Sequence, residues 1–123
     1  FRRVLFRSIE FDEYATLPNG HVIERVLDTS DNSNNICRLN SSDISLPLIV
    51  RTRKIGDKMY IKGMDGSKKV KDIFINSKIK LNDRDSWPIV LDSKNRIVWI
   101  PGVKKSKFDK KKSESYDIIL RYS

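Results

Sequence analysis

The chain has 123 residues, of which 38% are hydrophobic, and this size suits one compact domain with a modest core. It carries a formal net charge of +9 and one cysteine, which excludes an intrachain disulfide and fits a reducing compartment, so we expect a cytoplasmic protein. The sequence contains neither an apolar run long enough to cross a bilayer nor a secretory signal, so no membrane partner is expected.

The positive charge is concentrated beyond residue 46. Residues 1–46 hold five Lys/Arg and seven Asp/Glu, a net charge of −2, whereas residues 47–123 hold twenty Lys/Arg and nine Asp/Glu, a net charge of +11. A large field of one sign attracts a polyanion, and a nucleic-acid backbone is the natural candidate because it offers regularly spaced phosphates. A general bias toward lysine is the alternative, but it does not explain the uneven distribution.

Residues 1–8, FRRVLFRS, carry three arginines and stand apart from the patterned sequence that follows. We interpret them as a remnant of an added segment or as an extra first strand, and residues 9–123 as a single domain. Because the chain begins with Phe1 rather than Met, we expect it to be part of a longer protein.

Strand patterns dominate the first half of the chain. After a turn at residues 17–20, residues 21–27 are predicted to form a strand, which a polar loop over residues 28–35 follows. Residues 36–39 are strand-like again, and Cys37 is predicted to be a small core residue.

A strand over residues 46–53 carries two arginines on one face, with Leu48 and Val50 on the other. Strand geometry places Arg51 and Arg53 about 7 Å apart, close to the spacing of successive phosphates, so both could bind one nucleic-acid strand. The alternative is a structural network in which they pair with acidic residues, for which the candidates are Asp57, Asp72 and Asp85.

Two further strand regions complete the β pattern. Residues 89–91 and 96–100 flank a turn and predict a hairpin that Pro101-Gly102 ends. Residues 116–122 alternate imperfectly, because Ile119 interrupts the period, and predict a closing strand.

One short helix is predicted over residues 67–75, with Ser67 as its cap and apolar residues at helical spacing at positions 70, 73 and 74. Gly63 and Gly66 precede it, so this segment predicts a glycine loop that enters a helix N-terminus, where an anion is favoured. The spacing does not match a Walker loop, and a phosphate of a larger polyanion fits better than a nucleotide. A plain solvated helix end is the alternative.

A second basic cluster, residues 104–112, lies between two predicted strands, and its run of charged residues predicts a long mobile loop. Such a loop can wrap nucleic acid, but a run of charges is as often only solvated.

Ordered motifs from residue 46 to residue 107 resemble the C-terminal domain of tRNA(Ile)-lysidine synthetase. They are Arg51-Thr52-Arg53, Gly56-Asp57-Lys58, residues 66–75 (GSKKVKDIFI), Arg84-Asp85-Ser86-Trp87-Pro88 and Trp99-Ile100-Pro101-Gly102. Asn76 departs from the family, which commonly has Asp at that position, and residues 1–8 do not resemble it.

The resemblance implies an α+β fold that is mostly β: a β-sandwich-like domain of uncommon topology with a short helix near residues 67–75, similar to a domain of the phenylalanyl-tRNA synthetase beta subunit. It also implies a parent bacterial ligase that uses ATP, with Mg, to attach lysine to the wobble cytidine of the AUA-reading isoleucine tRNA. The family's ATP-binding Ser-Gly-Gly-x-Asp-Ser loop belongs to an N-terminal catalytic domain and does not occur in this sequence. We therefore expect this chain to be non-catalytic and to have no cofactor or metal of its own.

The implied role is to grip the acceptor-stem backbone of tRNA(Ile), with the N-terminal catalytic domain as partner in the same polypeptide. The candidate tRNA contacts are Arg51, Arg53, Lys58, Lys68, Lys69, Lys71, Lys104, Lys105 and Lys107. A dimerisation or interdomain structural module of the same enzyme is the alternative function, and an independent enzyme is disfavoured because His21 is the only histidine and the sequence shows no nucleophile set.

The aromatic residues have structural and functional interpretations. Trp87 and Trp99 could stack on unpaired bases at the single-stranded end of a tRNA, but their apolar context favours core packing, most clearly for Trp99. Met59, Tyr60 and Ile61 are predicted to fill the core beneath the neighbouring turn.

Overall fold

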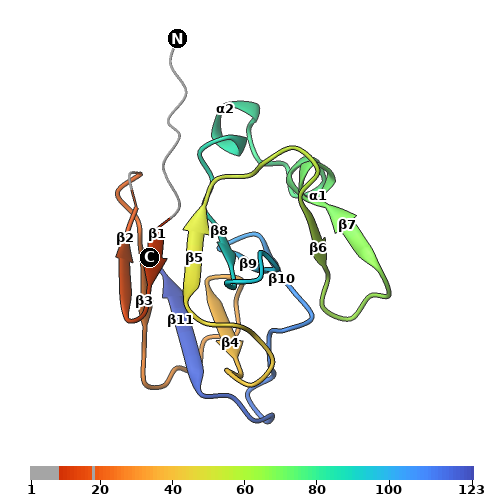
Figure 1. Cartoon of the computed structure of the whole chain (residues 1–123). Coiled ribbons are helices and arrows are strands. Elements are labelled where there is room, and N and C mark those ends of the chain that lie inside the picture. Colours follow the sequence, from red (N-terminus) through yellow and green to blue (C-terminus); the bar gives the residue numbers. More distant parts are fainter. Residues whose placement is uncertain (1–8, 18) are drawn as a thin grey trace.

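The computed structural model describes residues 9–17 and 19–123 (Figure 1). Eleven strands and two short helices occur within them. The strands are β1 (Ile9–Phe11), β2 (Tyr14–Thr16), β3 (Val22–Arg25), β4 (Ile36–Leu39), β5 (Leu48–Arg51), β6 (Lys58–Tyr60), β7 (Ser67–Lys69), β8 (Ile89–Leu91), β9 (Ile97–Ile100), β10 (Lys104–Lys105) and β11 (Ile118–Tyr122). The helices are α1 (Val70–Asn76) and α2 (Leu81–Arg84).

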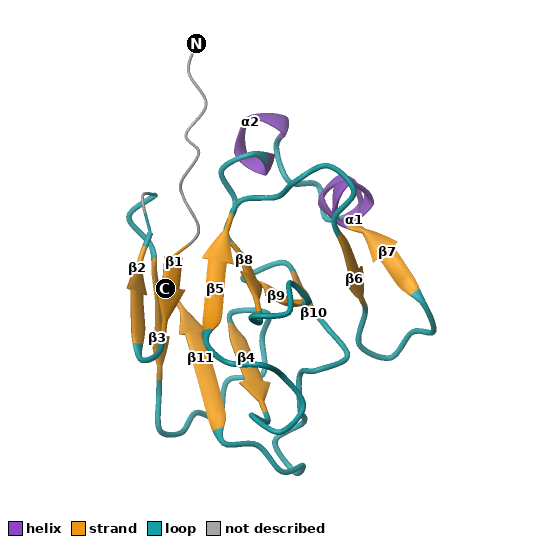
Figure 2. Cartoon of the chain, in the orientation of Figure 1, coloured by secondary structure: helices purple, strands orange, loops and turns teal. Residues whose placement is uncertain are grey.

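The strands form three antiparallel sheets. A five-stranded sheet has the order β1-β5-β8-β9-β10, a four-stranded sheet the order β2-β3-β11-β4, and β6 and β7 form a separate hairpin. Figure 2 shows this hairpin, with α1 at its end, on the opposite side of the molecule from β2 and β3. The mostly β, sandwich-like fold class is therefore confirmed.

Within the five-stranded sheet, β8 and β9 are buried on both faces, which explains their continuous apolar runs. On one face Val90 and Trp99 pack with residues of the four-stranded sheet, such as Ile23 and Leu120, in a first core. On the other face residues of β8 and β9 pack with Phe74 of α1 and with β6 in a second core. The β6–β7 hairpin is thus fixed to the sandwich through its own hydrophobic layer.

Most of the strand predictions are confirmed. The hairpin of β8 and β9, the strand β3, the polar loop after it and the closing strand β11 lie where expected, and Cys37 is fully buried in β4. The strand predicted over residues 46–53 is shorter, because β5 pairs only over Leu48–Arg51 while Leu46 is exposed. The prediction for residues 1–8 lies outside the described residues.

The helix was predicted to begin too early. Residues 67–69 form strand β7, Ser67 pairs with Tyr60 rather than capping a helix, and α1 starts at Val70 without a side-chain cap. Gly63 and Gly66 have φ of +77° and +80°, so they turn the chain back as a hairpin instead of leading it into a helix. The predicted glycine loop at a helix N-terminus is therefore wrong.

Two smaller predictions are also wrong. Tyr60 is 51% exposed, because alternation along β6 buries Met59 and Ile61 and turns Tyr60 outward. Residues 104–112 are not one long loop: Lys104–Lys105 pair with β9, Ser106 bridges to Ile61, and Asp109 is buried.

Candidate nucleic-acid interface

The outer face of the β6–β7 hairpin carries cations around one aromatic ring. In the hairpin register Lys58 lies opposite Lys69 and Tyr60 opposite Ser67. Cross-strand partners project from the same side of a sheet, so these four side chains share a face. Lys58, Lys69 and Ser67 are exposed.

The first part of the second basic cluster, residues 105–107, lies directly beside this hairpin. The Lys107 amide donates to the Tyr60 carbonyl (2.8 Å), and the Lys62 amide donates to the Lys105 carbonyl (3.2 Å). The Lys107 ammonium lies 4.6 Å from the centroid of the Tyr60 ring. Two basic segments that are about 40 residues apart in the chain therefore meet in one surface. We call Lys58, Tyr60, Lys69 and Lys107 the basic hairpin face.

The three lysines of the basic hairpin face make no ion pair within the part of the chain that the structure describes. Like charges directly opposite each other, as at Lys58 and Lys69, disfavour the strand pairing unless an anion balances them. Lys62, by contrast, is paired with the buried carboxylate of Asp109. The basic hairpin face thus presents positive charge that the described residues leave uncompensated.

The other predicted lysines are distributed around this face. Lys68 lies opposite Met59, on the inner side of the hairpin, and is only partly exposed. Lys71 is exposed in the first turn of α1, and Lys104 is exposed on the edge strand β10. Lys105 is partly buried, and its ammonium donates to the Asn32 carbonyl (3.1 Å).

The two predicted arginines form the structural network that was the alternative to a phosphate site. Arg51 is 9% exposed and binds both carboxylate oxygens of Asp57, at 2.9 and 3.0 Å. Arg53 donates to Asp85 (3.1 Å) and lies over the Phe74 ring at 5.6 Å. These pairs connect β5 to the start of β6 and to the segment after α2, so neither arginine belongs to the basic hairpin face.

Two carboxylates that pair with arginines are held in the charged form. Burial raises the pKa of Asp57, but hydrogen bonds from the Arg51 guanidinium and the Lys54 amide outweigh it, so the pKa lies below its ordinary 3.8. Asp92 is fully buried, and hydrogen bonds from the Arg96 side chain and from the Arg96 and Ser45 amides lower its pKa in the same way.

These lowered pKa values predict loss of stability in acid. A carboxylate whose pKa falls on folding contributes stability above its unfolded pKa, and this contribution is lost as the pH drops through the folded pKa. The free energy of unfolding should therefore stay nearly constant from neutrality to about pH 4 and then fall steeply. Urea unfolding at a series of pH values measures this. Asp92→Asn should be less stable at neutral pH and should lose less stability in acid, and a variant with the same acid slope as the parent chain would contradict the assignment.

Neither tryptophan is a free stacking surface. Trp99 is fully buried, and its indole N–H donates to the Asn34 carbonyl (3.0 Å). Trp87 is partly buried against the second core and donates to the Pro101 carbonyl (2.9 Å). The core interpretation is confirmed for Trp99, and the aromatic residue that lies among the cations is Tyr60, which sequence reasoning placed in the core.

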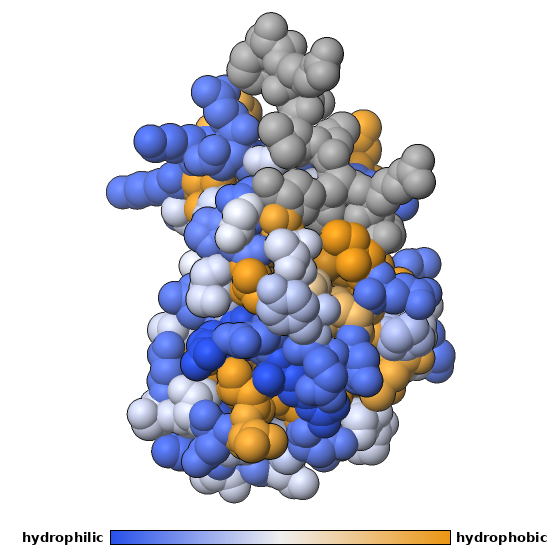
Figure 3. Space-filling view, turned by 90° about the vertical axis from the view of Figure 1, so that its left-hand side faces the viewer, coloured by the Kyte–Doolittle hydropathy of each residue, from blue (hydrophilic) through white to orange (hydrophobic). Residues whose placement is uncertain are grey.

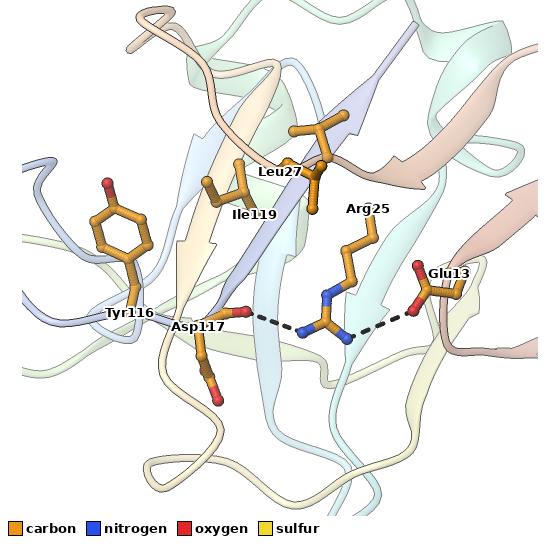
Figure 4. Close-up of a pocket in the computed structure, with 7 residues that line it drawn as sticks. Glu13, Arg25, Leu27, Tyr116, Asp117 and Ile119 are labelled. Carbon is orange, nitrogen blue, oxygen red and sulfur yellow. Dashed lines mark hydrogen bonds and ion pairs between the residues drawn. The ribbon is translucent and has the colours of Figure 1, made fainter.

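A pocket lies away from the basic hairpin face, on the four-stranded sheet. It has a volume of about 380 Å³, and Arg25 extends into it, donating to the Asp117 carbonyl (2.9 Å) with Glu13 at 3.8 Å (Figure 4). An adjacent pocket of about 340 Å³ shares Arg25 and is lined by apolar residues that include Leu46 and Leu48. The first pocket is unsuited to a polyanion because the acidic residues Glu13 and Asp117 are among those that line it.

The described residues provide neither a metal-binding cluster nor a membrane-spanning helix. Nowhere among them do three or more His, Cys, Asp or Glu side chains gather in a way that could hold a metal ion. Across the same residues, neither helix has the length and apolar character required to span a membrane.

Comparison with known proteins assigns this arrangement to a family. The sequence model described as "TilS substrate C-terminal domain" matches residues 48–120, which span β5 to β11 and include the whole basic hairpin face. The chain belongs to the family of TilS substrate C-terminal domains.

Solved and curated proteins agree with this family. A solved structure titled "Crystal structure of TILS C-terminal domain" superposes with a TM-score of 0.84 and 39% identity, covering 94% of this chain and 95% of that one. The chain is 48% identical to tRNA(Ile)-lysidine synthase of Bacillus subtilis over 115 residues, 90% of the chain and 24% of that protein. It is 43% identical to the bifunctional protein TilS/HprT of Listeria innocua over 122 residues, 96% of the chain and 19% of that protein.

The chain therefore spans about a quarter or less of the curated relatives that it matches. Within a TilS substrate C-terminal domain the observed ion pairs explain three of the sequence motifs. The Arg-x-Arg strand supplies Arg51 and Arg53, and the Gly-Asp and Arg-Asp motifs supply their partners Asp57 and Asp85.

Proposed function

We propose that this chain is the substrate-binding domain of a tRNA(Ile)-lysidine synthase and that its basic hairpin face binds the phosphate backbone of the tRNA acceptor stem. The observation that carries the proposal is the meeting of two basic segments around Tyr60, with three lysines free of ion pairs within the described residues. The family membership supports tRNA as the polyanion.

The chemistry of the site fits an RNA duplex. The major groove of A-form RNA is too deep and narrow for side chains, so proteins recognise it through its shape, phosphates and 2′-hydroxyls. Lysine suits such contacts, because its ammonium acts as a point charge without a fixed orientation. Lys71 and Lys104, which are exposed outside the basic hairpin face, would extend the contact along the backbone.

In this proposal the chain holds the substrate and other parts of the polypeptide carry the reaction. The N-terminal catalytic domain would use ATP and Mg to join lysine to the wobble cytidine of tRNA(Ile) in the bacterial cytoplasm. A hold on the acceptor stem, far from that base, adds to the contacts made near it, because linked sites raise each other's effective concentration.

The experiment is a titration of the chain with fluorescently labelled tRNA(Ile) at several salt concentrations. If four or five phosphates are contacted, log affinity should fall with log salt with a slope of magnitude about 3 to 4. Changes of base pairs in the stem should alter the affinity little, because the backbone is read. Binding that does not depend on salt, or no binding at low salt, would contradict the proposal.

A second candidate function, dimerisation or docking to the rest of the polypeptide, is supported by the opposite side of the molecule. Leu27 is fully exposed and Leu46 is 51% exposed, near the two pockets that share Arg25. In Figure 3, which faces this side, hydrophobic side chains lie among hydrophilic ones in the lower part of the view. Light scattering after size-exclusion chromatography, with and without tRNA, distinguishes self-association from RNA binding, and Leu27→Ser should weaken association only if this surface is the interface.

A further inference from the structure

Tyr60 occupies the centre of the basic hairpin face. Its cross-strand partner is the small Ser67, and Lys58 precedes it by two residues on the same face of β6. Lys107 lies over its ring, and about half of the side chain remains exposed. A single exposed aromatic residue is common on protein surfaces. Tyr60 differs because its surroundings are cations that lack ion pairs among the described residues.

An exposed ring among lysines suits one class of ligand better than the others. Proteins that bind single-stranded nucleic acid combine cations for the backbone with aromatic rings on which bases stack, whatever the sequence. Bases inside a duplex are already stacked on their neighbours, so only an unpaired nucleotide offers a free face to a ring. Lysines alone would be sufficient to hold a stem, whereas the ring adds a surface that a stem cannot use.

The geometry of β6 fits a backbone next to such a base. Alternate residues on one strand face are about 7 Å apart, similar to the distance between successive phosphates. The distance between the Lys58 and Tyr60 side chains is therefore about the length of one nucleotide. Lys69, on β7, and Lys107, on the segment after β10, lie beside them. The basic hairpin face can thus hold the phosphates on either side of a stacked base.

We propose that Tyr60 stacks on an unpaired nucleotide that adjoins the RNA stem, while Lys58, Lys69 and Lys107 bind the neighbouring phosphates. This inference rests on the proposed RNA-binding function and narrows its substrate class to a stem with a single-stranded extension. It makes Tyr60 a residue that distinguishes the end of a stem from its interior.

The test compares two RNA hairpins with the same stem, one blunt and one with a short single-stranded 3′ extension, by fluorescence anisotropy. The parent chain should bind the extended RNA at least about fivefold more tightly, the lower limit expected for one base–aromatic stack. Tyr60→Leu should abolish this preference, so that the variant binds the two RNAs with similar affinity. Tyr60→Phe keeps the ring and should retain the preference.

Tyr14 provides the matched control, because it is 57% exposed in β2, on the other side of the molecule. Tyr14→Leu should not change the preference. Equal affinity of the parent chain for the two RNAs, or an unchanged preference in Tyr60→Leu, would overturn the stacking inference and leave the backbone-binding function intact. Failure to bind either RNA at low salt would overturn both.

Discussion

Replacing Lys58, Lys69 and Lys107 together with alanine should nearly abolish the binding of tRNA by this chain. Each lysine that neutralises a phosphate releases about one counterion, so the slope of log affinity against log salt should decrease in magnitude by about three. Affinity at low salt should fall by at least about a hundredfold, while the urea midpoint changes little, because all three side chains are on the surface. A titration of labelled tRNA across salt concentrations measures both quantities.

The matched control removes the same charge elsewhere. Lys94, Lys111 and Lys112 are exposed and make no ion pair among the described residues, and they lie outside the β6–β7 hairpin and β10. Their triple alanine variant should keep most of the salt slope. If the two triple variants lose affinity equally, net charge and not the basic hairpin face is responsible, and the proposed interface is wrong.

Asp57→Ala should be among the most destabilising single substitutions in the chain. It leaves the Arg51 guanidinium, whose side chain is 11% exposed, without its carboxylate, and it removes the acceptor of the Lys54 amide. Removing one partner of a largely buried pair costs about 3 to 5 kcal/mol, and slight solvent access reduces this to about 2 to 4 kcal/mol. Urea unfolding of the two proteins gives the difference directly.

Glu24→Ala is the control for this prediction, because Glu24 and Arg121 form an ion pair whose side chains are 32% and 48% exposed. Such a surface pair contributes about 1 kcal/mol or less. Adding Arg51→Met to Asp57→Ala should recover part of the loss, since a buried apolar side chain needs no partner. A cost for Asp57→Ala no larger than that for Glu24→Ala would show that the pair is not a structural link.

The strands that were predicted correctly are those whose pattern is decided locally. Ile89–Leu91 and Ile97–Ile100 are short apolar runs around a turn. They are apolar at every position because both faces of these two strands are buried. The prediction for residues 67–69 was wrong. Val70, Ile73 and Phe74 have helical spacing, and a serine three residues before Val70 is a typical helix cap, so the helix was predicted to begin at Ser67. In the structure these residues form a strand instead, because the turn at Gly63 and Gly66 brings them beside β6, with which they pair.

In the candidate site too, some features could be predicted from the local sequence and others depend on contacts between distant segments. Sequence charge alone pointed to the lysines, but it could not separate those with ion pairs, such as Lys62, from those without, such as Lys58. Tyr60 was missed because the run Met59-Tyr60-Ile61 was read as uniformly apolar. The available signal was the alternation of Lys58, Tyr60 and Lys62 with the apolar residues Met59 and Ile61. Because Met59 and Ile61 are buried on one face of the strand, Tyr60 between them points to the other face, toward solvent.

The two-sided burial of β8 and β9 has a consequence for how RNA would act on the whole domain. Because these strands pack against α1 and β6 on one side and against the four-stranded sheet on the other, the hairpin cannot detach without exposing the middle of the molecule. A ligand that binds only the folded hairpin therefore raises the melting temperature of the entire chain by mass action. Under saturating RNA, the amide hydrogens of β11, on the far side of the sandwich, should exchange with solvent more slowly as well.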